Sequence, residues 1–300
     1  MRLDGIKGIA NAVLYEGYML YPYRPSALKN QRPGWSFGTL LPPAYVETTP
    51  GDSDYMEGQM LLAGADSADV NVEIRFLQLA GSAGAEALER TVSLTAPMNE
   101  LLAGPKKSQQ FTFCSGQGGV KVEGTVELTA TRVSDAALKL VVRVHNRTPL
   151  VTRAASRDEA LPYSLIAAHA ILAINQGEFV SLLDPPENLK TEAAACHQRG
   201  AFPVLVGDEG SRQNMLLSPI ILEDYPKIAP ESPGDFFDSA EIDELLTLRL
   251  LTLTDSEKDE LRQAGKTTLD LLDRTHSCRP EELLRMHGVI RERLTEKEHS

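Results

Sequence analysis

The stretch VKVEGTVELTATRVSDAALKLVVRVH, residues 120–145, decides the fold class. Apolar and polar residues alternate along residues 120–132, and this period of two is that of a half-buried β-strand. A polar turn at Ser134–Asp135 leads into residues 138–145, so the stretch predicts a long antiparallel hairpin. Further strands are predicted at residues 70–76, 90–95, 110–114, 202–206 and 215–222.

Two other segments need more interpretation. Residues 163–174 are nearly all apolar and could form a helix, but the turn at 175–177 and the apolar segment 178–183 favour a central hairpin. Residues 48–69 are rich in Gly, Asp and Ser, so we interpret them as a loop with a short apolar insert. The first two-thirds of the chain is therefore predicted to be mainly antiparallel β, as a sandwich or a strongly curled sheet.

Helical patterns lie at both ends of the chain and at one internal position. Residues 4–17 have apolar side chains at helical spacing, and residues 184–197 begin with two prolines that suit a first helical turn. Beyond Pro233 the capping boxes and apolar faces predict helices. The whole is an α+β fold with three parts. They are an N-terminal helix and aromatic extended segment at 1–50, an antiparallel β domain at 51–232 and a C-terminal helical segment at 233–300.

The composition argues against several classes of protein. Hydrophobic residues make up 42% and charged residues 24% of the chain, as is typical of a globular protein. The net charge of −12 argues against a nucleic-acid partner, because phosphate binding needs concentrated Lys and Arg. Cys114, Cys196 and Cys278 are far apart, so neither a disulfide framework nor a CxxC metal site is expected. There is no apolar run long enough to span a membrane and no signal pattern, so we expect a cytoplasmic protein.

Carboxylates are densest at the start of the predicted C-terminal helical segment. Asp238 and Glu241 form a capping box there, and a helix start favours nearby negative charge. Asp224 and Asp235 have no such role, and clustered carboxylates are the ligands that hard divalent cations prefer. A metal site of Asp224, Asp235 and His169 is therefore an alternative to a plain helix start. The competing interpretation of His169, which lies in an apolar run, is a buried, hydrogen-bonded core histidine.

Much of the aromatic content lies in residues 15–37, with basic side chains between the rings. Tyr, Trp and Arg dominate binding hot spots, so this segment is a candidate surface for a protein partner. The alternative is a segment packed across the main domain, with its rings filling grooves. The candidate partner-binding residues are Tyr18, Tyr21, Tyr23, Arg24, Lys29 and Trp35.

Four runs of sequence resemble an uncharacterised bacterial family whose members are often encoded beside nickel–iron hydrogenase genes. The runs are residues 11–30 (NAVLYEGYMLYPYRPSALKN), 179–187 (FVSLLDPPE), 218–258 (beginning SPIILEDYPKIAPESPGDFFDS) and 280–288 (PEELLRMHG). The resemblance spans nearly the whole chain. It implies association with a hydrogenase, and it assigns no catalytic residue because the family has no established reaction.

No complete catalytic motif is visible in the sequence, whether GxSxG, HExxH, a P-loop or a Rossmann glycine pattern. We therefore expect a non-enzymatic accessory or assembly protein without a cofactor, with nickel–iron hydrogenase subunits as the candidate partners. Two alternatives stay open. One is an enzyme or divalent-metal-binding protein that uses the clustered carboxylates, and the other is a self-assembling structural protein, which would be a homo-oligomer.

Overall fold

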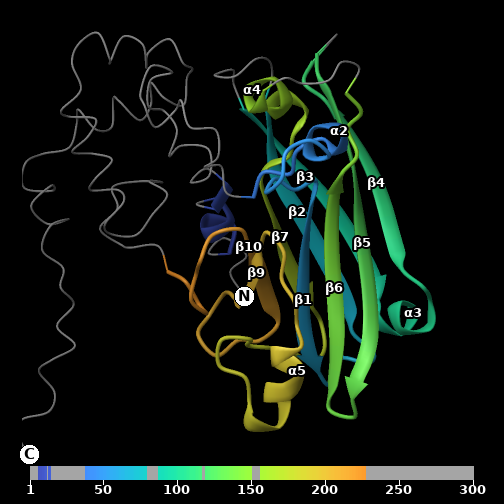
Figure 1. The fold of residues 1–300 in the computed structure, drawn as a ribbon. Helices are drawn as coiled ribbons and strands as arrows, with labels where there is room; N and C mark the ends of the chain where they lie inside the picture. Colours follow the sequence, from blue (N-terminus) through green and yellow to red (C-terminus); the bar gives the residue numbers. More distant parts are fainter. Residues whose placement is uncertain are drawn as a thin grey trace, which may run out of the picture. The chain divides into compact units, whose positions relative to one another are not determined.

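Ten strands of the described chain form two five-stranded sheets in which every pairing is antiparallel (Figure 1). The computed structural model describes residues 6–11, 13–14, 38–79, 87–116, 119–150 and 156–227. The first sheet has the order β4 (Lys107–Cys114), β5 (Lys121–Ser134), β6 (Ala137–Asn146), β1 (Tyr55–Ala63) and β8 (Glu178–Val180). The second sheet has the order β3 (Ala87–Pro97), β2 (Asp69–Leu79), β7 (Ile166–Ile174), β10 (Asn214–Ser218) and β9 (Phe202–Leu205). The prediction of a mainly antiparallel β structure is confirmed for this part of the chain.

Short helices precede β1 or lie between later strands. They are α2 (Pro43–Val46), α3 (Met98–Ala103), α4 (Arg157–Ala160) and α5 (Lys190–Ala194), with 3₁₀ turns at Leu161–Tyr163 and Glu187–Leu189. The last 3₁₀ turn and α5 fall where a helix was predicted over residues 184–197, and they are shorter than that prediction. Within the described ranges, no helix is long and apolar enough to cross a membrane.

The predicted hairpin of residues 120–145 lies in the first sheet. β5 and β6 pair around a turn at residues 135–136, with Thr125 opposite His145 and Thr129 opposite Val141. Alternate side chains of both strands are buried, as the period of two requires. The other side chains form the outer face of this sheet, where polar groups gather.

The prediction of a loop at residues 48–69 is wrong, because β1 runs through this segment. The even-numbered residues of β1 are buried between the sheets, and Gly58 is one of them. A Cβ added to Gly58 would overlap the side chain of Leu217 in the second sheet. This glycine therefore lets the two sheets approach closely, although a glycine in a sequence more often indicates a turn.

The predicted hairpin over residues 163–183 is also wrong. β7 pairs with β2 and β10 in the second sheet, whereas β8 pairs with β1 in the first sheet. The turn at residues 175–177 therefore carries the chain from one sheet to the other. Gly177 has φ +78°, and a Cβ there would lie 2.7 Å from the carbonyl oxygen of Ala63, so the crossing needs glycine. An apolar return strand has the same sequence pattern whether it pairs with its neighbour or crosses the core.

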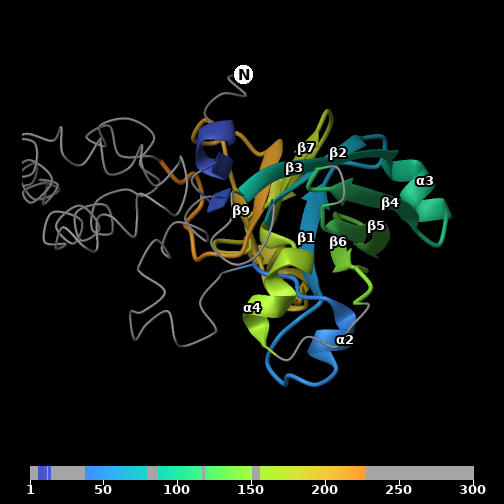
Figure 2. The same cartoon turned by 90° about the horizontal axis from the view of Figure 1, so that it is seen from above.

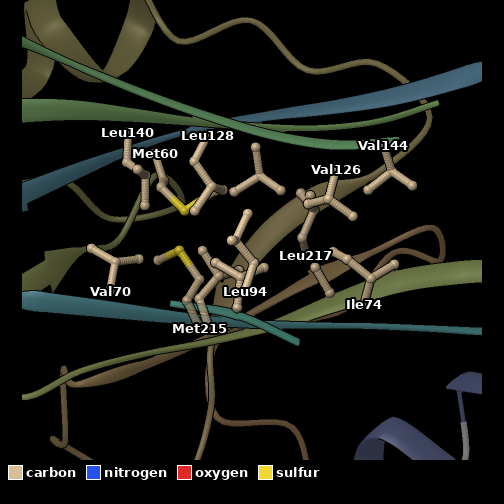
Figure 3. Close-up of a cluster of buried hydrophobic side chains, with 14 of the residues drawn as sticks. Met60, Val70, Ile74, Leu94, Val126, Leu128, Leu140, Val144, Met215 and Leu217 are labelled. Atoms are coloured by element: carbon tan, nitrogen blue, oxygen red, sulfur yellow. The ribbon is translucent and has the colours of Figure 1, made fainter. Parts of the chain in front are cut away.

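The two sheets face each other across a large hydrophobic cluster (Figure 3). Met60 of the first sheet lies opposite Met215 of the second. Seen from above, β2 and β3 form one layer and β4, β5 and β6 another (Figure 2). Phe76 of β2 meets Phe111 and Phe113 of β4, with ring centroids 5.6 and 5.8 Å away. These contacts join the layers, because burial of apolar surface is the dominant favourable term in folding.

The second sheet is also covered on its outer face. Residues 6–11 and 13–14 are helical, in agreement with the helix predicted over residues 4–17. Ile6 and Val13 belong to a buried cluster with Val206 and Leu216, on the face of the sheet that points away from the core. This helix explains why both faces of β10 are buried.

Candidate functional site

All six residues predicted to bind a partner lie outside the described residues: Tyr18, Tyr21, Tyr23, Arg24, Lys29 and Trp35. Asp235 of the predicted metal set and the predicted C-terminal helical segment at 233–300 lie outside them as well. The structure places the other two members of the metal set, Asp224 and His169. Each of them has hydrogen bonds that account for its position.

Asp224 ties the last described segment to the second sheet and to the loop after β8. Its Oδ1 accepts a hydrogen bond from the Leu205 backbone N–H at 2.7 Å, and its Oδ2 accepts one from the Ser181 hydroxyl. The Ser181 oxygen in turn accepts from the backbone N–H groups of Leu183 and Asp184. Both carboxylate oxygens therefore hold separate parts of the chain together.

Removal of this carboxylate is expected to destabilise the protein. Asp224→Ala leaves the Leu205 N–H and the Ser181 hydroxyl without their acceptor, which we expect to cost about 1–3 kcal/mol. Asp224→Asn keeps one acceptor oxygen and should lose less. Urea unfolding followed by circular dichroism measures both variants. A free energy of unfolding for Asp224→Ala equal to that of the wild type would show that the carboxylate is not a structural tie.

His169 is fully buried on the outer face of the second sheet. Its neighbours Ala168 and Ala170 belong to the core between the sheets, so His169 lies on the opposite face of β7. His169 Nδ1 lies 2.8 Å from the Ala167 carbonyl oxygen, which assigns the proton to Nδ1 and leaves Nε2 as an acceptor. Burial, together with the positive charge of Arg75, lowers the pKa of His169 to about 4. The ring is therefore neutral at pH 7.

Arg75 is the cross-strand partner of His169 in the register of β2 and β7. Its Nη2 donates to Asn11 Oδ1 at 2.7 Å and to Glu89 Oε2 at 3.3 Å, so it links the N-terminal helix to β3. In the described part of the structure, Arg75 Nη1 and His169 Nε2 are buried without a hydrogen-bond partner.

The backbone beside His169 is irregular. Ala167 has φ 52°, a left-handed conformation that is uncommon for a residue with a Cβ. The pairing of β2 with β7 shifts register between Arg75 and Leu77, which is the signature of a β-bulge. A bulge changes the direction of nearby backbone groups. Here the Ala167 carbonyl oxygen points toward the His169 ring and accepts its Nδ1 hydrogen bond.

The described residues do not assemble a metal site. No group of three or more His, Cys, Asp or Glu side chains among them could hold a metal ion. His169 also lies next to Arg75, whose positive charge disfavours a cation. The set that combines Asp224, His169 and Asp235 stays a prediction, because Asp235 is not among the described residues.

The outer face of the first sheet carries a group of side chains that sequence reasoning did not identify as a site. We call it the Tyr55 cluster, and its members are Tyr55, Arg143, His145, Arg147 and Arg199. Tyr55 of β1 lies opposite His145 of β6, with ring centroids 5.2 Å apart. The guanidinium carbon of Arg199 lies 4.3 Å from the centre of the Tyr55 ring, and that of Arg143 lies 5.8 Å from it. These distances are those of cation–π interactions.

Backbone pairing positions the Tyr55 cluster. Arg199 lies beside β1, where its N–H and C=O both form 2.9 Å hydrogen bonds with the backbone of Glu57. Arg147 comes directly after the end of β6, and β6 pairs with the opposite edge of β1. Arg199 therefore approaches Tyr55 from one side of β1, and His145 and Arg147 approach from the other side.

Arg143 is the ion-paired member of the cluster. Its Nε donates to Glu57 Oε2 at 2.7 Å, and the Gln59 amide donates to Glu57 Oε1 at 2.8 Å. Burial acts to raise the pKa of Glu57, but the hydrogen bonds from Gln59 and Arg143 outweigh it and hold this pKa below its usual value. The ionised Glu57 carboxylate therefore neutralises Arg143.

His145 contributes a ring but no charge at pH 7. Burial is the first cause that lowers the pKa of His145, and the positive charge of Arg147 is the second. A lowered pKa keeps the imidazole neutral, since an ordinary histidine is already mostly neutral at this pH. The positive charge of the Tyr55 cluster therefore belongs to its arginines.

One feature of the sequence indicated part of the Tyr55 cluster. The alternation along residues 138–145 places Arg143 and His145 on the same polar face of a strand. Tyr55 lay in the segment interpreted as a loop, and Arg199 is far from it in sequence. No local pattern could bring Tyr55 and Arg199 together, because they meet only through the pairing of β1.

Comparison with known proteins adds no family to these observations. No protein-family model matches the chain, and no curated protein matches it.

Proposed function

We propose that this chain is a non-enzymatic accessory protein that binds a protein partner, and that the Tyr55 cluster is part of its binding surface. The observation that carries the proposal is the Arg199 guanidinium stacked 4.3 Å from the centre of the half-buried Tyr55 ring. Arg199 itself is exposed. Tyrosine and arginine are the residue types enriched at the energetic centres of protein interfaces.

The rigidity of this surface supports the proposal. Tyr55, Arg143 and His145 stand on paired strands, and Glu57 holds the Arg143 side chain. Side chains that are ordered before binding lose little conformational entropy when a partner arrives. A ready-made aromatic and arginine surface is therefore favourable for association.

The candidate partner is a subunit of a nickel–iron hydrogenase, because four sequence runs resemble a family encoded beside such genes. In this proposal the protein works in the cytoplasm as a β-sandwich followed by a C-terminal helical segment. The aromatic segment that contains Tyr21, Arg24 and Trp35 adds further contact surface. No described residue group favours an enzymatic reaction over this function.

Tyr55→Ala is expected to reduce recovery of hydrogenase subunits with the tagged full-length chain about fivefold or more, because it removes the ring on which Arg199 stacks. Arg132→Ala is the control. Arg132 lies opposite Leu138, and Tyr55 lies opposite His145. Leu138 and His145 are seven positions apart on β6, which is roughly 23 Å along the strand. Mass spectrometry identifies the subunits, and binding is then repeated with the purified subunits.

Two results would count against the proposal in different ways. If no hydrogenase subunit binds the wild-type chain, either on recovery or after purification, the accessory function for a hydrogenase is wrong. If subunits bind Tyr55→Ala as well as the wild type, the partner binds elsewhere on the chain and the Tyr55 cluster is not its surface.

A further inference from the structure

Two arginines of the Tyr55 cluster have guanidinium groups that a ligand can reach. Arg147 and Arg199 are exposed, and neither forms an ion pair with any other residue that the structure describes. The Nε of Arg199 donates to the Ser53 hydroxyl at 3.3 Å, and the Arg199 side chain as a whole is exposed. Arg143, by contrast, is bound to Glu57. The free positive charge of the cluster therefore comes from Arg147 and Arg199.

These two arginines flank a pair of rings. Arg199 stacks on Tyr55, and Arg147 lies close enough to His145 for its charge to act on the ring. Two acids also act on His145, namely Glu127, which is paired with Lys106, and Asp54. The exposed arginines Arg147 and Arg199 therefore lie beside fewer unpaired acids than the net charge of −12 of the chain would suggest. Exposed arginines without an ion-pair partner favour a partner that brings carboxylates, because complementary charges select partners.

We propose that the Tyr55 cluster binds an acidic segment of a protein partner, whose Asp or Glu carboxylates bond to the guanidinium groups of Arg147 and Arg199. This inference rests on the proposed function and adds the chemistry of the partner. Arginine suits the task because its planar, forked donors match a carboxylate with two parallel hydrogen bonds.

The range of electrostatic forces favours a short acidic segment over a nucleic acid. At physiological salt, charges on exposed groups are screened beyond about 8 Å, so the distant acids of this chain repel a short segment only weakly. A nucleic acid would carry its phosphates across many of those acids and needs a more extended basic surface. Arg147 and Arg199 have no ion-pair partner among the described residues, and two guanidinium groups can bind one or two carboxylates.

His145 provides a readout that is specific to this surface. Burial is the first cause that lowers its pKa, and the charge of Arg147 is the second; Arg143 also lowers this pKa, while Glu127 and Asp54 raise it. A carboxylate bound to Arg147 would offset that charge, so the pKa of His145 should rise when an acidic ligand binds. A ligand that binds elsewhere on the chain would leave it unchanged.

The test titrates the full-length chain with a hexaglutamate peptide at physiological salt, with hexaserine as the control peptide. Proton NMR follows the His145 ring, and calorimetry gives the affinity. We expect saturable binding of hexaglutamate and a higher pKa of His145 in the bound state. Arg147→Ala and Arg199→Ala should each weaken binding about five- to tenfold. Arg132→Ala removes an exposed arginine that is paired with Asp66, and should weaken binding by about twofold or less.

Equal weakening by all three substitutions, or an unchanged His145 pKa in the peptide-saturated protein, would overturn the inference. If the wild-type chain self-associates and Arg199→Ala abolishes this association, the Tyr55 cluster binds a second copy of the chain. That result would also overturn the inference. Tyr55→Ala could abolish binding of purified hydrogenase subunits while Arg147→Ala and Arg199→Ala leave it unchanged. That result would overturn the inference of an acidic partner segment and leave the proposed function standing. If no subunit binds the wild type, the proposed function itself fails.

Discussion

Acidification from pH 6.5 to pH 4 is expected to lower the free energy of unfolding by about 3 kcal/mol through His169 alone. The pKa of His169 is about 4 in the folded protein, against an ordinary value of 6.5. Between these two pH values the unfolded chain binds a proton at His169 and the folded chain does not. Stability therefore falls as the pH falls through this window. The stability that the neutral His169 ring provides is fully present well above pH 6.5. Well below pH 4 both the folded and the unfolded chain bind the proton, so His169 causes no further change in the free energy of unfolding.

The measurement is urea unfolding at a series of pH values for the wild type and for His169→Asn. The asparagine amide can donate to the Ala167 carbonyl as Nδ1 does, but it does not titrate. The variant should therefore lose less stability than the wild type between pH 6.5 and pH 4, by about 3 kcal/mol. His197→Gln, which changes an exposed histidine, is the control and should follow the wild-type profile. Parallel profiles for His169→Asn and the wild type would refute this effect.

Phe76→Ala is expected to destabilise the protein by about 3–5 kcal/mol. Phe76 is fully buried, and its ring lies between the second sheet and the rings of Phe111 and Phe113 in the first. Truncation removes the apolar contacts and leaves a cavity, because the strands on both sides cannot close over it. The effect is large since the lost contacts connect the two layers.

Thermal and urea unfolding measure this loss, with Phe76→Leu as the matched variant. Leucine keeps most of the buried volume and should cost less than about 1.5 kcal/mol. Phe113→Ala should cost less than Phe76→Ala because Phe113 is only half-buried. A loss of less than about 1 kcal/mol for Phe76→Ala would mean that the two sheets do not depend on this ring.

Local patterns were sufficient for the strands that alternate clearly. β5 and β6 follow the period of two along residues 120–132 and 138–145, and they pair as a hairpin because a short polar turn joins them. The helical residues 6–11 and 13–14 followed from apolar spacing in the same way. In each case the residues that decide the structure are close together in sequence.

β1 and the β7–β8 connection could not be predicted in this way. Gly58 marks a close approach to Leu217 of the other sheet, and that neighbour is remote in sequence. The turn at Gly177 crosses between sheets because β8 finds its partner in β1. Both features depend on pairing between distant segments, and the local pattern is the same for either outcome.

The same distinction between local pattern and long-range pairing applies to the candidate sites. By itself, the sequence determined that His169 lies in an apolar run and that Arg143 and His145 share one polar strand face, because these facts depend only on neighbours and periodicity. The tertiary structure decided that Arg75 lies beside His169, and that Arg199 stacks on Tyr55. Those contacts join residues far apart in the chain. They exist only because strand register and the packing of two sheets bring the residues together.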